Sequence, residues 1–116
     1  MSNLKDLIRL RHMLDYAREA VGLIQGKVRE DLNHDRLLEL GLVRLMEIIG
    51  EAASRASTEC QSMYPAIPWL QIIGLRNRLI HGYDAVDMDI LWQILKQDLP
   101  NLIGELEKIL SKEADR

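Results

Sequence analysis

The stretch LLELGLVRLMEIIGEAASRA, residues 37–56, carries the pattern that decides the fold. Its apolar side chains recur at alternating spacings of three and four residues, which places them on one stripe of an α-helix. The stripe consists of Leu38, Leu42, Leu45, Ile49, Ala52 and Ala56. It predicts a helix that is capped by Asn33 or Asp35 and that reaches about Glu59.

A second set of apolar side chains lies on the other sides of this helix. These residues are Leu37, Leu40, Val43 and Ile48, and they alternate with Arg44, Glu47, Glu51 and Arg55. A helix that is apolar on two sides is covered on two sides. One cover is the core of the domain, and a second subunit is the expected source of the other. The sequence therefore predicts a contact with a second subunit.

Further helices are predicted on both sides of this stretch. An apolar stripe in the N-terminal segment, formed by Leu7, Leu10, Leu14, Ala17, Val21 and Ile24, predicts a helix over about 3–25. Pro65 and Pro68 interrupt the chain, and a third helix is expected over about 68–81. Gly82 is expected to end it, because glycine adopts the left-handed geometry of a helix C-terminus.

The C-terminal segment completes the predicted architecture. Asp87 is placed to cap a fourth helix that carries Leu91 and Leu95. The apolar stripe resumes beyond Pro100, which marks a kink or the start of a short fifth helix. Short connections between these helices predict an all-α fold, an antiparallel four- to five-helix bundle, with residues 1–116 forming a single domain.

Composition limits the classes of function. The net charge of −3 excludes a uniformly basic surface that coats nucleic acid, so an RNA contact would be confined to a local site. Cys60 is the only cysteine, which excludes an internal disulfide and a cysteine-cluster metal site. The N-terminus lacks the uninterrupted apolar run of a signal peptide, and no segment is apolar enough to span a membrane. We therefore expect a cytoplasmic protein with no membrane contact.

Arg76 is the charged residue of the third predicted helix that requires an explanation. A regular helix would place Arg76 in the middle of its apolar face, whereas Arg78 would point to the opposite side. That face consists of Trp69, Ile72, Ile73, Leu79 and Ile80. A guanidinium among aliphatic side chains must be paired or must line a cleft. Arg76 is therefore either paired with an acid such as Glu51 or part of a functional cleft.

His81 and Tyr83 follow Arg76 closely. His81 would lie at the end of the helix, either as an ordinary residue favoured by the helix dipole or as a group that transfers protons. Tyr83 would lie in an exposed turn with its hydroxyl free. Together with Arg76 they form a polar group at a place where simple packing would use leucine.

Four other residues have simpler explanations. His12 lies beside Arg9 and Arg11 on a face of the first helix that is expected to be solvated. His34 and Asp35 provide only two metal-type ligands, and helix capping explains this pair. Cys60 has no evident histidine partner and is expected to fill space in the core.

Four segments together resemble the HepT-like branch of the HEPN superfamily. They are IIGEA at 48–52, YPAIPW at 64–69, GLRNRLIHGYDAVD at 74–87 and DLPNL at 98–102. The string Gly-Leu-Arg-Asn, followed by His81 and Tyr83, is the most specific of these matches. The resemblance extends over the whole chain.

This resemblance implies a metal-independent ribonuclease toxin that acts as a homodimer, without a cofactor, on RNA. Its partner would be a nucleotidyltransferase antitoxin of the MntA type. Arg76 and His81 would be catalytic, in a cleft where two subunits meet, and Asn77 and Glu51 would support them. Tyr83 would accept AMP from the partner. The alternative function is a non-catalytic subunit that binds a nucleotide or regulates a nucleotidyltransferase through the same cleft.

Overall fold

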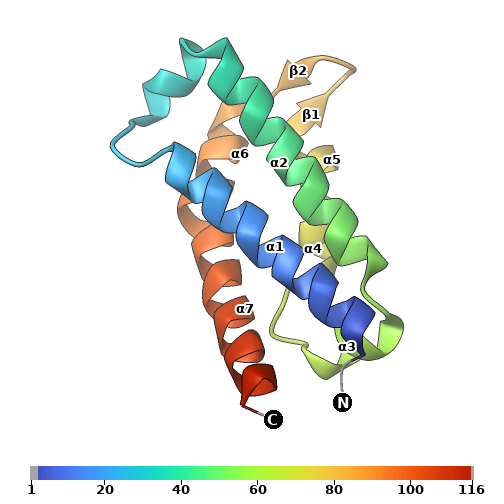
Figure 1. Cartoon of the computed structure of the whole chain (residues 1–116). Coiled ribbons are helices and arrows are strands. Elements are labelled where there is room, and N and C mark those ends of the chain that lie inside the picture. The colour runs from blue at the N-terminus through green and yellow to red at the C-terminus, as the bar shows by residue number, and fades with distance from the viewer. Residues whose placement is uncertain (1–2, 116) are drawn as a thin grey trace.

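Three long helices frame the molecule, namely α1 (Leu4–Leu23), α2 (Arg36–Arg55) and α7 (Leu99–Ala114). α1 packs against both of the others and runs antiparallel to each (Figure 1). The computed structural model describes residues 3–115, so residues 1, 2 and 116 of the expected domain lie outside the described residues. Apart from one short two-stranded ribbon, the described chain is helical where it is regular, and the predicted all-α bundle is confirmed.

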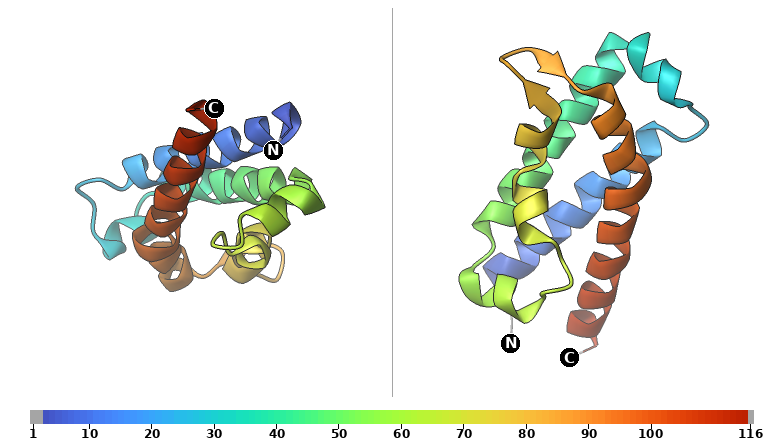
Figure 2. Two further views of the ribbon diagram at one scale, coloured as in Figure 1. Left: turned by 90° about the horizontal axis from the view of Figure 1, so that it is seen from below. Right: turned by 180° about the vertical axis from the view of Figure 1, so that it is seen from behind.

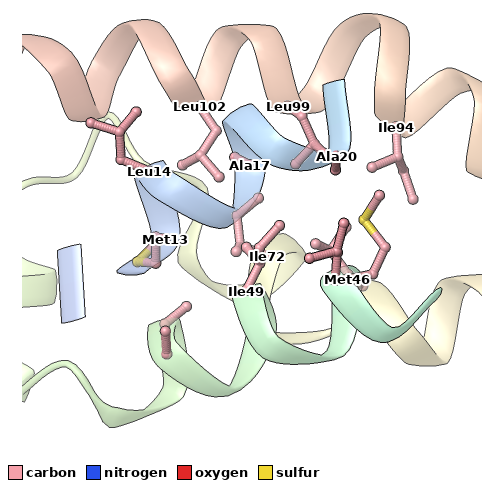
Figure 3. Packing of buried hydrophobic residues seen from close by; sticks show 14 of the residues in the cluster. Met13, Leu14, Ala17, Ala20, Met46, Ile49, Ile72, Ile94, Leu99 and Leu102 are labelled. Atoms are coloured by element: carbon pink, nitrogen blue, oxygen red, sulfur yellow. The ribbon is translucent and has the colours of Figure 1, made fainter. Parts of the chain in front are cut away.

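Aliphatic and methionine side chains from these helices fill the centre of the bundle. Figure 3 shows Met13 of α1, Ile49 of α2 and Leu102 of α7 within one cluster. Each of these side chains is at most 1% exposed. Burying a side chain of this size contributes roughly 1.5–3 kcal/mol, so this cluster supplies the main driving force for folding.

Helix α2 begins as predicted but ends earlier. The Asp35 carboxylate accepts a hydrogen bond from the Leu38 N–H at 3.0 Å, which selects Asp35 over Asn33 as the cap. The helix ends at Arg55 because Ser57 caps a separate short helix, α3 (Thr58–Met63). A 3₁₀ turn, η1 (Arg29–Asn33), lies in the predicted loop between α1 and α2.

The predicted third helix, over about 68–81, is wrong in its second half. The chain forms α4 (Trp69–Ile73) and α5 (Leu75–Leu79), which are separated at Gly74. Residues 80 and 81 are extended, and they pair as strand β1 (Ile80–His81) with strand β2 (Ala85–Val86). Figure 2 shows this ribbon beyond one end of α5, beside the start of α2.

Gly82 lies in the turn of this ribbon and does not end a helix as predicted. Its φ of 75° is the left-handed value that glycine adopts without strain, and it reverses the chain between the strands. The register pairs Ile80 with Val86 and His81 with Ala85. The Asp87 N–H then donates to the Leu79 carbonyl at 2.8 Å, which closes the ribbon.

The C-terminal helical run contains a π-helical turn before Pro100. It consists of α6 (Met88–Gln93), η2 (Ile94–Asp98) and α7, with helical backbone angles at the junctions. The Leu99 N–H donates to the Ile94 carbonyl, five residues earlier. A proline ring clashes with the carbonyl four residues before it, so the wider turn provides room for Pro100 within a continuous helix. The kink or helix start that was expected at Pro100 is thus a π-helical turn, a local widening within one continuous helical run.

The second apolar side of α2 is uncovered at the start of the helix, whereas Val43 and Ile48 further along are partly buried. Leu37 is 82% exposed and Leu40 is 49% exposed, and Leu70 on the neighbouring α4 is 86% exposed. We call Leu37, Leu40 and Leu70 the outer leucines. Within residues 3–115 no helix is both long enough and apolar enough to cross a bilayer.

Candidate functional site

Helix α5 presents Arg76 and Asn77 to solvent because two leucines anchor its other side. Leu75 and Leu79 are fully buried. The Arg76 side chain is 53% exposed, so the expectation that it lies in the middle of a buried apolar face is wrong. The break at Gly74 ends the regular helical projection on which that expectation depended. Arg76 lines a cleft and is also paired with an acid, so each of the two possibilities holds in part.

The acid that pairs with Arg76 is Glu47. Its Oε2 lies 3.1 Å from Arg76 Nε. The predicted partner Glu51 is one turn further along α2 and binds Arg55 at 2.8 Å, so that assignment is wrong. Because Glu47 engages only Nε, the guanidinium retains further N–H groups that can donate to an anion.

A groove of about 360 Å³ lies between α2 and the α4–α5 segment. We call it the α2–α5 groove, and its lining consists of Arg44, Met46, Glu47, Gly50, Glu51, Ser54, Ile73, Arg76 and Asn77. Gly50 brings the two walls together, because a Cβ there would lie 3.1 Å from the Ile72 carbonyl oxygen. The structure thus brings Arg76, Asn77 and Glu51 to one groove.

His81 and Tyr83 lie on the ribbon that follows α5 and do not line this groove. The His81 side chain is 62% exposed and Tyr83 is 93% exposed. The expected exposed turn at Tyr83 is confirmed. His81 lies on an extended strand, so the expectation that it is a residue at the end of a helix is wrong.

Asp87 is the charged neighbour of His81. Its Oδ1 accepts a hydrogen bond from the Ile90 N–H at 3.0 Å and caps α6 as predicted. Its Oδ2 lies 3.6 Å from His81 Nε2. The pKa of the Asp87 carboxyl is lowered, chiefly by the hydrogen bond from the Ile90 backbone and also by the charge of His81. No local pattern in the sequence indicates the contact of Asp87 with His81, because the contact depends on the ribbon.

Arg78 holds α5 against the π-helical turn. Its Nη1 lies 2.8 Å from Asp98 Oδ2, and the two side chains are 33% and 22% exposed. Arg78 is therefore more buried than Arg76, which is the reverse of the expectation. The ion pair attaches the short helix that carries Arg76 and Asn77 to the C-terminal helical run.

The remaining candidates lie outside the α2–α5 groove. His12 is exposed and lies 6.2 Å from the Tyr16 ring. Asp35 is a helix cap and His34 is exposed. Cys60 is buried, and burial raises its pKa to about 11, so it remains a thiol near neutral pH. Within the described part of the chain, no three His, Cys, Asp or Glu residues form a possible metal site.

Comparisons with known proteins agree on one family. A family model described as "Ribonuclease HepT-like" matches residues 13–109. "Probable ribonuclease HepT" of Thermococcus cleftensis is 36% identical over 100 residues, 83% of this chain and 91% of that protein. "Putative RNase TTE0752" of Caldanaerobacter subterraneus is 34% identical over 104 residues, 90% of this chain and 93% of that protein. No solved structure gives a significant match.

Proposed function

We propose that this chain, which belongs to the HepT-like ribonuclease family, is an endoribonuclease that cleaves RNA without a metal ion. The observation that carries the proposal is the placement of Arg76 in the α2–α5 groove, on a helix that continues directly into the strand of His81. Arg76 has spare N–H donors, and the His81 imidazole is open to solvent. A phosphate-binding cation and a group that transfers protons near neutral pH are the two components that the reaction needs.

The proposed reaction uses the RNA 2′-hydroxyl as the nucleophile. His81 accepts the proton of this hydroxyl, the 2′-oxygen forms a bond to phosphorus, and the bond from phosphorus to the 5′-oxygen breaks. The leaving oxygen takes up a proton, so the products are a 2′,3′-cyclic phosphate and a free 5′-hydroxyl. Arg76 donates hydrogen bonds to the phosphate oxygens as negative charge accumulates there, and Asn77 orients the phosphate.

We also propose that the active site is completed in a homodimer. The outer leucines expose apolar side chains on α2 and α4, the elements that form walls of the α2–α5 groove, and a second copy would remove these side chains from water. His81 does not line the groove of its own chain. A two-fold interface along α2 would provide a cleft in which the motif residues of both subunits face one RNA strand. Glu51, in the groove wall, would support the site.

We further propose that the chain is a toxin and that attachment of AMP to Tyr83 controls its activity. Tyr83 is 93% exposed and lies two residues after His81. A nucleotidyltransferase antitoxin of the MntA type can therefore reach its hydroxyl and attach AMP. The added nucleotide would block access to His81 and would repel RNA through its negative charge. The chain would then act as the toxin of a toxin–antitoxin pair.

The decisive experiment is cleavage of total cellular RNA by the purified chain in EDTA. We expect chelator-resistant cleavage, and we expect Arg76→Ala and His81→Ala each to reduce it by about 10²–10⁴-fold. Arg18→Ala is the matched control, because it removes an arginine from an exposed ion pair with Glu107, on α1 and α7. If the unmodified, folded dimer does not cleave RNA, the alternative function, a non-catalytic nucleotide-binding subunit, replaces this proposal.

A further inference from the structure

The contact between His81 and Asp87 depends on how the ribbon is closed. His81 pairs with Ala85 on the opposite strand, and the Asp87 N–H donates to the Leu79 carbonyl. These interactions fix the backbone on both sides of the two side chains. His81 Nε2 and Asp87 Oδ2 are thus brought to 3.6 Å although five residues lie between them in the sequence. This distance exceeds a hydrogen bond, so the contact is an electrostatic one.

The α6 cap determines which way the Asp87 carboxylate faces. Oδ1 is held by the Ile90 N–H at 3.0 Å, which leaves Oδ2 on the side of His81. The lowered pKa of this carboxyl keeps it anionic at neutral pH. Asp87 therefore presents a fixed negative acceptor to one nitrogen of the imidazole.

The other charged groups near the ribbon are mostly engaged elsewhere. On α5, Arg76 pairs with Glu47 and Arg78 pairs with Asp98. On α6, Asp89 pairs with Arg29 at 2.8 Å. Asp84 lies in the exposed turn of the ribbon itself. Of the ion pairs found among residues 3–115, the one with Asp87 is the only one that includes His81.

We infer that Asp87 is a positioning residue, which orients the His81 ring and fixes the nitrogen that carries its proton. This inference rests on the proposed function for its catalytic consequence. An anionic acceptor beside Nε2 favours the tautomer with hydrogen on Nε2, because the hydrogen then points at the carboxylate. Nδ1 is left unprotonated, and it is the atom that can take the proton from the 2′-hydroxyl of RNA.

The substitution Asp87→Asn separates this role from helix capping. Asparagine caps a helix as well as aspartate does, so its oxygen retains the bond to the Ile90 N–H. The amide NH₂ then faces His81 and donates where the carboxylate accepted. We expect the tautomer population of His81 to shift toward hydrogen on Nδ1, while the melting temperature remains close to that of the parent.

The test compares the parent, Asp87→Asn and Asp89→Asn. Asp89→Asn is the matched control, because it removes a carboxylate on the same helix that pairs with Arg29. Two-bond ¹⁵N NMR correlations at mildly alkaline pH report the tautomer of each histidine, and His12 and His34 serve as internal references. Initial rates on a labelled single-stranded RNA in EDTA give kcat and KM.

We expect Asp87→Asn to shift the His81 tautomer signal and to lower kcat roughly 10-fold with little change in KM, whereas Asp89→Asn changes neither. An unchanged His81 signal, or an unchanged kcat, in folded Asp87→Asn would overturn the inference. If the parent cleaves no RNA, the proposed function fails, and the NMR comparison alone decides the role of Asp87. Asp87→Ser retains a capping oxygen and replaces Asp87→Asn if that variant does not fold.

Discussion

Glu47 Oε2 lies 3.1 Å from Arg76 Nε, across the α2–α5 groove. The cation that we propose to bind RNA phosphate therefore already has an anionic neighbour in the free protein. A phosphate that enters the groove must compete with this carboxylate or share the guanidinium with it. The ion pair thus restrains Arg76 and weakens its attraction for RNA at the same time.

Removal of this competing charge is expected to strengthen RNA binding. Glu47→Gln should tighten binding of a short single-stranded RNA by up to about 5-fold, because an exposed ion pair contributes about 0–1 kcal/mol. Fluorescence anisotropy at low salt, on a His81→Ala background that prevents cleavage, provides the measurement. Glu107→Gln is the control, since it breaks a similarly exposed Arg–Glu pair away from the groove. Weaker binding by Glu47→Gln would show that Glu47 helps to position Arg76.

Substitution of Tyr83 is expected to block modification without loss of stability. The side chain is 93% exposed, so Tyr83→Phe should leave the free energy of unfolding within about 0.5 kcal/mol of the parent. Incubation with ATP and the nucleotidyltransferase that we propose as the partner, followed by intact-mass spectrometry, should show AMP on the parent and none on the variant. Tyr16→Phe is the control and should be modified like the parent. AMP on Tyr83→Phe would identify another residue as the acceptor.

The ion pair between Arg78 and Asp98 should contribute more to stability than the exposed pairs. Asp98→Ala leaves a guanidinium that is only 33% exposed without its partner, and we expect a loss of about 1–2 kcal/mol. Asp89→Ala removes a carboxylate that is 87% exposed, and Arg29 keeps its hydrogen bond to the Asn33 side-chain oxygen, so the effect should lie within about 0.5 kcal/mol. Urea denaturation measures both. Equal losses would contradict the role of the Arg78–Asp98 pair in holding α5 to the C-terminal run.

The close approach of α2 to α4 makes Gly50 intolerant of a larger residue. A Cβ at this position would lie 3.1 Å and 3.2 Å from two backbone carbonyl oxygens, of Ile72 and Ile73. Gly50→Ala should therefore destabilise the fold by roughly 1–3 kcal/mol. Gly104→Ala on α7 meets no atom within 4 Å and should stabilise the protein by up to about 1 kcal/mol. A neutral Gly50→Ala would indicate that the two helices separate easily.

Local patterns were sufficient to predict where α1 and α2 lie and that Asp87 caps α6, although they left Asn33 and Asp35 as alternatives for the cap of α2. The apolar stripes of α1 and α2 and the capping residues Asp35 and Asp87 are properties of neighbouring residues, and the structure confirms them. Tyr83 was correctly expected to be exposed, because it follows a glycine in a polar turn. Resemblance to a family pointed to the HepT-like ribonucleases, and the family match confirms it.

The predictions from the sequence were wrong where the structure depends on contacts between residues that are distant in the sequence. Residues 80 and 81 leave the helix because Val86 and Ala85 pair with them, and a helical projection contains no such information. Glu47 and Glu51 lie one turn apart on the same side of α2, so periodicity could not select the partner of Arg76. The Arg78–Asp98 and His81–Asp87 pairs were missed for the same reason.

The ribbon that contains His81 consists of two strands of only two residues each, and this affects how the protein responds to heating. Ile80 and Val86, which pair with each other, are only partly buried, and the other pair, His81 and Ala85, is exposed, so little apolar surface holds the ribbon closed. Segments of this kind open locally at a lower free energy than the surrounding core. Amide hydrogen exchange should therefore be faster in the ribbon than in the centre of α2. Heating would then open the ribbon that contains His81 before the helical bundle unfolds. A single melting temperature would not describe both the local opening and the global unfolding.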